Sequence, residues 1–383
     1  MIRVAVVTTE LTASRVPQLD RLAQRPELEL QVFYAAESIQ GRTWSLQPRH
    51  PHEILRGPSL PLERLLFHDY PVTPGLWRKL SRGRFDVAVV WGWSVFAAQL
   101  AVVWARVHRV PYVVFSESQL VEPRSWAVHV LKRLVVPRVV RPAAGLLVTG
   151  TRAREHLVHY GGDPAAIRVF ANTVDVASLE RRVDAARERR AEIRARLGLA
   201  DEDVAVLYAG RLVPVKAVEV LAASVARAGP PFRLVVAGDG PERERVERAA
   251  APASIFTGFQ GEAGLAETYA AADVFALLSR KETWGVVVVE AAAAGLPIVV
   301  SARVGAGADL VEDRVNGRVV PADDPAATAD ALRGLADGEL RRIYGARSRE
   351  RAAGWGYGPS EDAFVAAVTD ALSRRQTSRG AGP

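Results

Sequence analysis

Two glutamates stand at the ends of an apolar stretch, in the sequence ETWGVVVVE that runs from Glu282 to Glu290. The four valines alone would favour a strand, but alanines follow them, and a helix from near Gly285 that ends before Gly295 fits better. On this interpretation Glu282 lies in the loop before the helix and Glu290 lies inside it. A glutamate buried in a helix is costly unless its carboxylate accepts hydrogen bonds. Hydroxyl groups of a ligand would supply them, and so would an arginine.

Two cations form a second candidate site, in the sequence GRLVPVK that runs from Gly210 to Lys216. Arg211 and Lys216 stand between a predicted strand and a predicted helix. Cations at the start of a helix favour an anion, because the unpaired N–H groups and the helix dipole add to their charge. Only four of the 50 basic residues are lysines, which draws attention to Lys216. The alternative for both side chains is solvated surface charge.

Glycines follow two further predicted strands, at Gly238 in GDGPERE and at Gly258 in IFTGF. Glycine permits close backbone approach, so these turns suit either a helix cap or the wall of a nucleotide pocket. Neither GxxxxGK[ST] nor GxGxxG follows a strand, so the usual nucleotide fingerprints are missing. Cysteine is absent, which excludes disulfides, thiolate metal sites and a cysteine nucleophile. We also find no convincing metal-ligand cluster.

The elements that must position these residues are short β-branched runs alternating with helical patterns, which predict parallel strands in doubly wound α/β sheets. The first series of expected strands is Arg3–Val7, Glu29–Tyr34, Asp86–Val90, Tyr112–Ser116 and Gly145–Val148. The second series is Val204–Ala209, Phe232–Ala237, Ile255–Thr257, Val274–Leu277, Ile298–Ser301 and Gly317–Val320. In such sheets ligands bind beyond the carboxyl ends of the strands, where the two cations, Glu282 and the glycines stand.

A charge-rich helix expected over Ala177–Leu199 separates the two series, and the chain of 383 residues suits two domains. We expect one domain over residues 1–175, a second over 176–356, and within 357–383 a helix that packs back toward the first domain. The residues from 374 onward are polar and are predicted to be disordered. Residues 87–105 carry no charge, but the strand that follows favours a strand, a turn and a helix over a membrane span.

The charge balance is basic, with 50 Lys and Arg against 43 Asp and Glu, a net charge of +7. The arginines are spread along the chain, so we interpret the charge as general solubility. Nucleic-acid binding is not expected, because the sequence has no basic arm and no aromatic–basic motif. The N-terminal apolar run is too short for a signal peptide, and we expect a cytoplasmic protein.

Five segments in order resemble the retaining glycosyltransferases of family 4, which have the GT-B fold. They are YAGRLVPVK, VVAGDGPER, IFTGF, YAAADVFALLSRKETWGVVVVEAAAAGLPIVVS and GAGADLVEDRVNGRVVPADD. The matching segments run in order from Leu207 to Asp324, and the match is looser over residues 86–175, where GDPAAIRVFANTVD resembles the segment that links the family's domains. The resemblance implies two Rossmann-like domains that face each other across a cleft, with the C-terminal domain holding a nucleotide-sugar donor and the N-terminal domain the acceptor.

The resemblance also implies roles for the charged residues. Arg211 and Lys216 would contact the donor diphosphate and stabilise the charge of the leaving group. Glu290 would accept hydrogen bonds from the ribose, and Glu282 would lie at the 3- or 4-hydroxyl of the donor sugar. The two carboxylates would then hold opposite ends of one donor. Transfer would proceed with retention, without a protein nucleophile, and with the donor phosphate taking the proton of the acceptor.

The remaining donor contacts implied by the resemblance are made by backbone groups and by the base-binding residues. They are Gly210, Gly238, Gly258, Phe259, and the backbone N–H groups of Trp284, Gly285 and Val286. The implied co-substrate is a UDP-sugar, and the family requires neither a metal ion nor another cofactor. The partners are therefore a nucleotide-sugar and a sugar-accepting molecule.

The sequence departs from the family at three points. Trp284 stands where phenylalanine is common, which should narrow the sugar pocket. The loop TTELTASRVP lacks the glycine pair that many members place beside the diphosphate. The strand end FSESQL has no histidine, whereas many members have one there near the donor sugar. Glu117 and Ser116 would line the cleft at this point, but we assign them no role. These departures concern the acceptor side.

Three alternatives therefore stay open. A soluble natural product would suit the region of Trp91 and Trp93. A lipid-linked or cell-surface glycan at the inner face of the membrane would suit residues 125–142, where cations mix with valines and leucines. An epimerase or a non-catalytic GT-B protein is the third, and an epimerase would hydrolyse or isomerise the donor without any acceptor.

Overall fold

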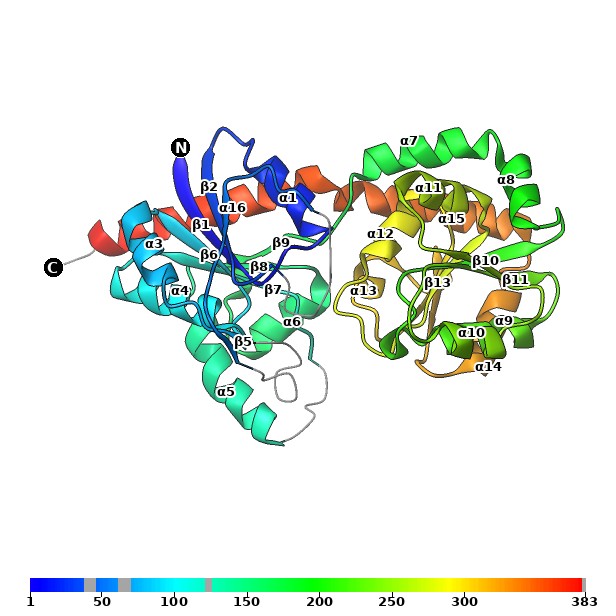
Figure 1. The fold of residues 1–383 in the computed structure, drawn as a ribbon, viewed down its shortest axis with the longest axis horizontal. Coiled ribbons are helices and arrows are strands. Elements are labelled where there is room, and N and C mark those ends of the chain that lie inside the picture. Colours follow the sequence, from blue (N-terminus) through cyan, green and yellow to red (C-terminus); the bar gives the residue numbers. More distant parts are fainter. Residues whose placement is uncertain (38–45, 61–69, 121–125, 381–383) are drawn as a thin grey trace. The chain divides into compact units, whose positions relative to one another are not determined.

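The computed structural model describes residues 1–37, 46–60, 70–120 and 126–380. The chain divides into two compact units, one made of residues 1–172 with 358–383, and the other of residues 173–357. Each unit contains its own parallel sheet (Figure 1). The α/β class expected from the alternating pattern is confirmed.

The second unit contains a six-stranded sheet in the order β12-β11-β10-β13-β14-β15. Its strands are β10 Val204–Ala209, β11 Phe232–Ala237, β12 Ile255–Gly258, β13 Val274–Leu277, β14 Ile298–Ser301 and β15 Gly317–Val320. Every neighbouring pair is parallel. Numbered along the chain this is the order 3-2-1-4-5-6 of a dinucleotide-binding fold, with its switch point between β10 and β13. All six strands expected in this half are confirmed, β12 being one residue longer.

The first unit repeats this order and adds one strand, as β3-β2-β1-β6-β7-β8-β9. These strands are β1 Ile2–Thr8, β2 Leu28–Tyr34, β3 His52–Ile54, β6 Val87–Trp91, β7 Tyr112–Ser116, β8 Gly145–Val148 and β9 Ile167–Val169. A separate antiparallel pair joins β4 (Ser59–Leu60) to β5 (Tyr70–Pro71). The sequence did not predict β3 and β9, because a three-residue strand at a sheet edge carries little apolar signal.

Helices cover the sheets. In the first unit they are α1 Arg15–Leu22, α3 Leu76–Gly83, α4 Phe96–Val107, α5 Trp126–Val140, α6 Thr151–His159 and α16 Tyr357–Gly380. In the second they are α7 Val176–Arg187, α8 Arg190–Leu197, α9 Val218–Ala228, α10 Arg243–Ala249, α11 Glu262–Ala271, α12 Val286–Ala293, α13 Gly307–Leu310, α14 Pro325–Arg333 and α15 Gly338–Ala352. Residues 87–105 form β6, a turn and most of α4, as expected.

In the second unit the helices form two layers. Helix α9 packs with α10 and α14, whereas α11 and α12 pack with α7, and α15 packs with α12 (Figure 1). The strands between the layers are apolar at nearly every position, and β10, β13 and β14 are buried throughout. Burial on both faces explains why these strands appear in the sequence as continuous apolar runs instead of alternating ones.

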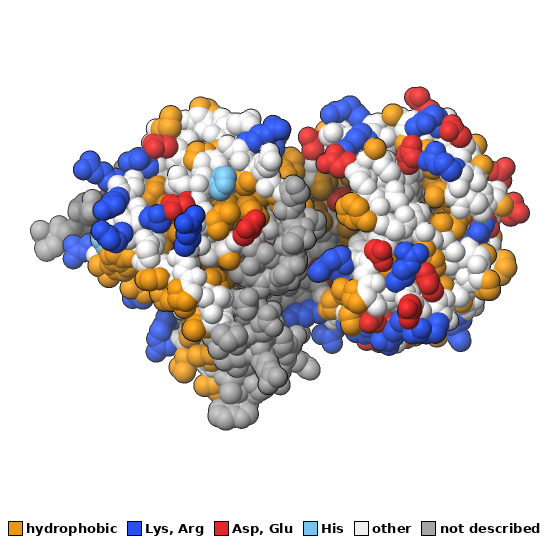
Figure 2. Space-filling view, viewed as in Figure 1, with side chains coloured by type: hydrophobic (Ala, Val, Ile, Leu, Met, Phe, Trp, Pro, Cys, Tyr) orange, Lys and Arg blue, Asp and Glu red, His pale blue; other side chains and the backbone are white. Residues whose placement is uncertain are grey.

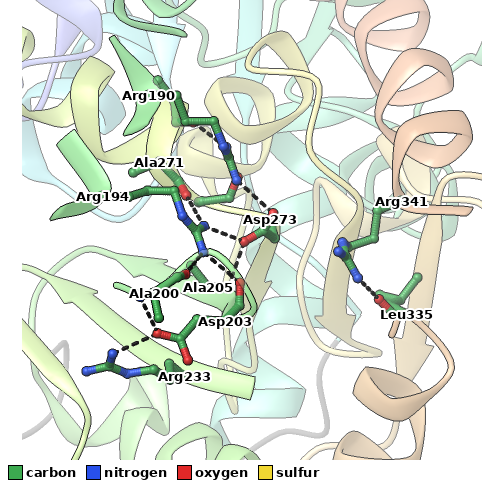
Figure 3. Close-up of polar contacts among 12 residues, drawn as sticks. Arg190, Arg194, Ala200, Asp203, Ala205, Arg233, Ala271, Asp273, Leu335 and Arg341 are labelled. Carbon is green, nitrogen blue, oxygen red and sulfur yellow. Dashed lines mark hydrogen bonds and ion pairs between the residues drawn. The ribbon is translucent and has the colours of Figure 1, made fainter. Parts of the chain in front are cut away.

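The single charge-rich helix expected over Ala177–Leu199 is wrong, because the chain bends between α7 and α8. The bend turns the arginines of α8 toward the amino end of β13 (Figure 3). The Asp273 carboxylate accepts hydrogen bonds from Arg190 at 2.8 Å and Arg194 at 2.9 Å. It also accepts the backbone N–H of Ala205 at 2.9 Å. A straight helix of solvated arginines would forgo this network.

Helix α16 belongs to the core of the first unit. Phe364, Ala367 and Val368 are buried in the cluster that also holds β1, and the Phe364 ring lies 5.4 Å from that of Phe170. The expected disorder from residue 374 onward is wrong through Gly380, where the helix continues. The anchored apolar face prolongs the helix through residues of moderate propensity. Residues 381–383, on which the rest of this prediction falls, lie outside the described residues.

The surface carries both signs of charge. Figure 2 shows basic and acidic side chains interspersed on the visible face of each unit. Within the part of the chain that the structure describes, no helix is long and apolar enough to cross a bilayer.

Candidate functional site

The candidate site of the second unit is built where β10 and β13 lie side by side, at the switch point of the sheet. The loop after β10 carries Arg211 and Lys216, and the loop after β13 carries Glu282. Parallel strands end at the same edge, so segments more than 60 residues apart in the sequence meet here.

The meeting point is an ion pair between Lys216 and Glu282. Both side chains are mostly buried, with 20% and 15% of their surfaces exposed. A shielded pair of opposite charges is costly to desolvate, and it is balanced only by close contact or by further polar partners. Lys216 is thus held inward, whereas Arg211 is exposed and has no side-chain hydrogen bond or ion pair within the described residues. Of the two predicted cations, one is fixed and one is available.

The loop after β10 is rigidly supported. Arg280 donates to the Pro214 carbonyl at 2.6 Å, and its guanidinium also pairs with Glu219 and Asp323, each at 2.7 Å. Its backbone N–H donates to the Val215 carbonyl at 2.9 Å. Sequence reasoning missed this arginine, because nothing in the sequence distinguishes it from the many others.

Tyr208, near the end of β10, supports the same loop from inside. Its hydroxyl donates to the Arg211 carbonyl at 2.8 Å. Burial and the nearby Glu282 carboxylate raise the pKa of Tyr208, so it remains a neutral donor.

The glycines after β10 and β11 are required by the packing of one loop on the other. A Cβ on Gly238 would lie 1.8 Å from the Gly210 carbonyl oxygen, and one on Gly240 would lie 2.4 Å from that of Leu212. Backbone bonds join the same loops, from Gly210 N–H to Ala237 and from Leu212 N–H to the next loop. The close approach anticipated for Gly238 is therefore made by protein backbone.

The residues expected to face the base lie at the end of β12. Gly258 has φ +69°, and Phe259, which follows it, has 81% of its surface exposed. An exposed phenylalanine side chain is available for stacking on a planar ring. Gly258 also forms an isolated bridge with Gly238, which places the ends of β11 and β12 together.

Helix α12 begins at the expected place. Gly285 is its N-cap, with a left-handed φ of +98°, and no side chain caps the helix. Its first N–H groups are consequently not occupied by a capping side chain. The loop before it is fixed by backbone bonds from Gly305 to Glu282 at 3.0 Å and from Ala306 to Trp284 at 2.8 Å.

The indole of Trp284 does not behave as the comparison with phenylalanine suggested. It is 2% exposed and packs against Trp355, with 5.0 Å between ring centres. The larger ring is thus accommodated in the interior of the second unit.

Glu290 lies one turn from the end of α12 and is partly exposed. The hydroxyl group of Tyr269, on α11, donates a hydrogen bond to the Oε2 atom of Glu290 at 2.9 Å. Burial raises the pKa of Glu290, and the bond from Tyr269 and the charge of Arg182 oppose that rise. The sequence left a ligand or an arginine as partners, and it missed the tyrosine, which stands 21 positions earlier on another helix.

A metal site is not apparent in this region. Among the described residues, no group of three or more His, Cys, Asp or Glu side chains is arranged to hold an ion. The site is therefore built from two cations, two carboxylates, a helix start and an exposed aromatic ring.

Two family models match the chain in succession. "Glycosyl transferase 4-like domain" matches residues 3–173, and "Glycosyl transferases group 1" matches residues 189–351. Together they span most of both units, and each falls mainly within one of them.

Curated relatives and solved structures agree with the models. A D-inositol 3-phosphate glycosyltransferase of Xylanimonas cellulosilytica is 31% identical, with 96% of this chain and 92% of the relative aligned. One from Kineococcus radiotolerans is 34% identical over 66% of this chain and 63% of its own length. The crystal structure of Anabaena HepE in complex with UDP aligns with a TM-score of 0.73 at 18% identity, covering 99% of this chain and 100% of that one.

The aligned length and identity of the first of these relatives, and the two consecutive models, establish the family. The neighbours also identify the paired Rossmann-like units as the GT-B fold. This chain belongs to the GT-B glycosyltransferases of the family 4 type.

Proposed function

We propose that this glycosyltransferase moves a sugar from a UDP-sugar to a hydroxyl group of its acceptor, with retention of anomeric configuration and without a metal ion. The second unit would hold the donor and the first unit the acceptor. UDP is favoured because the HepE structures of the same fold contain UDP and UDP-glucose. The observation that supports this proposal most directly is the ion pair between Lys216 and Glu282 at the switch point of the sheet. Arg211, in the same loop as Lys216, is exposed.

The charges of this site support the assignment of the diphosphate. A diphosphate placed beside Arg211 and Lys216 would find two cations and the uncapped start of α12. These groups supply the positive charge that a divalent ion provides in other sugar-nucleotide enzymes, which is why we propose a metal-independent reaction. Glu282 would shift from Lys216 toward a sugar hydroxyl once the phosphate neutralises the lysine.

The proposed donor contacts complete this arrangement. Glu290 would accept hydrogen bonds from the ribose through the oxygen that Tyr269 leaves available, and Phe259 would stack on the uracil. Gly210, Gly238 and Gly258 would keep the loops in register. The backbone N–H groups of residues 284–286 would face the sugar and phosphate.

The proposed reaction breaks the bond between the anomeric carbon and the diphosphate oxygen, and UDP leaves with the electron pair. The acceptor oxygen attacks the same face of the sugar and forms the new glycosidic bond. Its proton passes to the phosphate oxygen of the departing UDP, so the reaction needs no protein nucleophile. Arg211 and Lys216 would stabilise the charge that develops on UDP.

The first experiment is a thermal-shift panel of UDP, GDP, dTDP and ADP, each with and without Mg²⁺. Ligand at about 100 times its dissociation constant should stabilise the protein by about 2.7 kcal/mol. The proposal expects UDP to stabilise the protein equally with Mg²⁺ or EDTA, and the shift to be lost in Arg211→Ala. Stabilisation by another nucleotide, or by none, would contradict it.

The second experiment follows transfer from UDP-glucose to a panel of acceptors. D-inositol 3-phosphate is the first acceptor to test, because it appears in the names of the relatives. NMR of the product would establish whether the glycosidic bond keeps the configuration of the donor. Isomerisation of UDP-glucose without any acceptor would instead favour an epimerase, and inertness with bound UDP a non-catalytic protein.

One observation favours a membrane-bound acceptor as the second candidate. On α5, Val130, Leu131 and Leu134 are exposed, and Arg133 and Arg138 are exposed beside them. Apolar side chains flanked by cations suit the surface of an anionic bilayer. Co-sedimentation with vesicles of anionic and of neutral lipid at low salt tests this candidate, and no binding to either would eliminate it.

A further inference from the structure

Arg15, the first residue of α1, is a cation in an aromatic environment. Its guanidinium carbon lies 4.2 Å from the centre of the Phe115 ring, 5.0 Å from that of Phe170 and 5.5 Å from that of Trp91. Its side chain is only 7% exposed. Burial lowers the pKa of Arg15, and the charge of Glu117 opposes that shift. A buried cation without a partner is strongly destabilising, so the contact with Glu117 offsets the cost of burying the charge of Arg15.

Glu117 is held on one side only. Its Oε1 atom accepts hydrogen bonds from Arg15 at 3.0 Å and from the Asn172 amide at 2.8 Å. Among the described residues no hydrogen bond ends on its other oxygen, Oε2, and 36% of the Glu117 side chain is exposed. The carboxylate is therefore fixed in direction and keeps one oxygen available to solvent.

The Arg15 side chain, which pairs with Glu117, is itself held in place by further contacts. Gln18 accepts a hydrogen bond from Arg15 at 2.8 Å and donates one to the Ala171 carbonyl at 3.0 Å. The cation thus has a carboxylate, an amide and three aromatic rings around it, and these contacts leave it little freedom. A pair that served stability alone would not need a partly exposed carboxylate at its end.

The position of Glu117 is that of a ligand-binding residue. It follows β7 directly, Arg15 follows β1, and Trp91 ends β6. These strands are neighbours in the order β1-β6-β7, and β1 and β6 form the switch point of the first sheet. Ligands of such sheets bind beyond the carboxyl ends of the strands at this point.

We propose that Glu117 binds a hydroxyl group of the sugar acceptor through Oε2, and that Arg15 and Asn172 are positioning residues that fix this oxygen. The inference rests on the proposed function and names the chemistry of its acceptor. A carboxylate accepts a hydrogen bond from a neutral hydroxyl group and repels phosphate. The acceptor is therefore a polyol or sugar that presents hydroxyl groups to Glu117 and directs any anionic group elsewhere.

The test is isothermal titration calorimetry of two probes, D-inositol 3-phosphate and methyl α-D-glucoside, into protein saturated with UDP. In Glu117→Gln the amide oxygen still accepts from Arg15 and Asn172, but an NH₂ group replaces Oε2. We expect this variant to bind the better probe about tenfold more weakly, as for a lost hydrogen bond to a charged group. Its affinity for UDP should equal that of the wild type.

Asn172→Ala tests the positioning role, because it removes one of the two hydrogen bonds to Oε1 and leaves the charge of Glu117 in place. Its affinity for the probe should fall by about threefold, less than in Glu117→Gln. The matched control is Glu29→Gln. Glu29 pairs with Arg3 at 3.2 Å near the amino ends of β2 and β1, whereas Glu117 follows the carboxyl end of β7 in the same sheet. The control should bind probe and UDP as the wild type does.

Two results would overturn the inference while UDP still binds. One is equal probe affinity in Glu117→Gln, Glu29→Gln and the wild type, whatever their melting temperatures, since that pattern assigns Glu117 a structural role. The other is that neither probe binds the wild type at millimolar concentration. Failure of the wild type to bind UDP is a different outcome, which overturns the proposed donor site and the inference with it.

Discussion

At the scale of single residues, the site depends on carboxylates that already have partners. Glu282 is paired with Lys216, and Glu290 accepts a hydrogen bond from Tyr269. Both partners keep the carboxylates oriented without a ligand, which reduces the entropy lost when a donor is bound. The two glutamates differ in environment, and this difference yields separate predictions.

Alanine substitutions should separate the two roles. Glu290→Ala should weaken UDP binding about tenfold or more, because it removes the charged hydrogen bonds that we propose to the ribose. Glu282→Ala should leave UDP affinity nearly unchanged and lower kcat by about tenfold or more, because its proposed partner is the transferred sugar. Calorimetry with UDP and steady-state kinetics with UDP-glucose measure both. Equal UDP affinity in Glu290→Ala and the wild type would contradict the assignment.

The raised pKa of Glu290 predicts a pH-dependent stability. Between its ordinary value of 4.5 and its raised value, the folded protein binds more protons at this residue than the unfolded chain. This stabilisation is therefore full below 4.5 and is lost as pH rises through the raised pKa. Glu290→Gln cannot ionise, so without nucleotide it should melt at a higher temperature than the wild type at neutral pH.

Each unit by which the pKa is raised corresponds to about 1.4 kcal/mol. Calorimetric melting of the variant and the wild type from pH 8 to pH 5 measures this difference, which should shrink as pH falls. A difference that is constant with pH would show that the charge of Glu290 is not its cause. Tyr269→Phe, which removes the stabilising bond to the carboxylate, should enlarge the difference.

At the scale of elements, the loops after β10 and β11 are held together by backbone packing. Gly238 has φ +154° and lies against the Gly210 carbonyl, so neither a side chain nor another backbone angle fits there. This close packing of one loop on the other explains why both loops contain glycine although neither matches a nucleotide-binding fingerprint.

Gly238→Ala should separate these loops. The added Cβ would lie 1.8 Å from a carbonyl oxygen, and removing that overlap requires a backbone shift. We expect a loss of stability of about 1–3 kcal/mol, as for overpacking, together with weaker UDP binding. Gly354→Ala is the control, because a Cβ there meets no atom within 4 Å. Urea unfolding and UDP titration measure both effects, and wild-type behaviour of Gly238→Ala would refute the packing argument.

The Asp273 network fixes α8 on the sheet at the amino ends of β10 and β13, whereas the candidate loops follow the carboxyl ends of these strands (Figure 3). Asp273→Ala would leave Arg194, which is buried, without its carboxylate. Breaking a buried pair on one side costs about 3–5 kcal/mol, so urea unfolding should show a large loss. Glu339→Ala, which breaks an exposed pair with Arg342, should show no measurable loss. A similar effect of both variants would contradict the expected role of burial.

At the scale of the whole molecule, the C-terminal helix α16 completes the core of the first unit. Helix α16 returns after the second unit and contributes Phe364 to the core of the first, where the side chain is fully buried. The chain therefore passes between the units twice, after residue 172 and after residue 357. In the second unit Thr173 donates its hydroxyl to the Trp355 carbonyl, which joins the two passing segments.

Phe364→Ala should destabilise the first unit selectively. Removing a buried phenylalanine ring costs about 3–5 kcal/mol. Hydrogen exchange followed by mass spectrometry should show loss of protection in residues 1–172 and little change in residues 173–357. Phe259→Ala is the matched control, since that ring is exposed, and it should leave protection unchanged in both units. Equal loss of protection in the two units by Phe364→Ala would contradict their division.

The sequence by itself determined most of the parallel strands, the class of fold and the positions of the candidate loops. The strands Val274–Leu277 and Ile298–Ser301 could be predicted to the residue, because a parallel strand buried on both faces is a continuous apolar run bounded by polar turns. The start of α12 at Gly285 was equally local, since glycine and the following alanines specify it. Such features depend on neighbours in the chain.

Only the tertiary structure decided which side chains are partners. Glu282 meets Lys216, Glu290 meets Tyr269 and Trp284 meets Trp355, and each pair joins separate elements. The bend between α7 and α8 likewise depends on Asp273, which the sequence of the helices does not contain. Periodicity describes burial along one segment, whereas contacts between distant residues depend on the order of strands and the register of loops. The sequence therefore supplies the charged and aromatic residues of the candidate site, and the fold decides which of them are in contact.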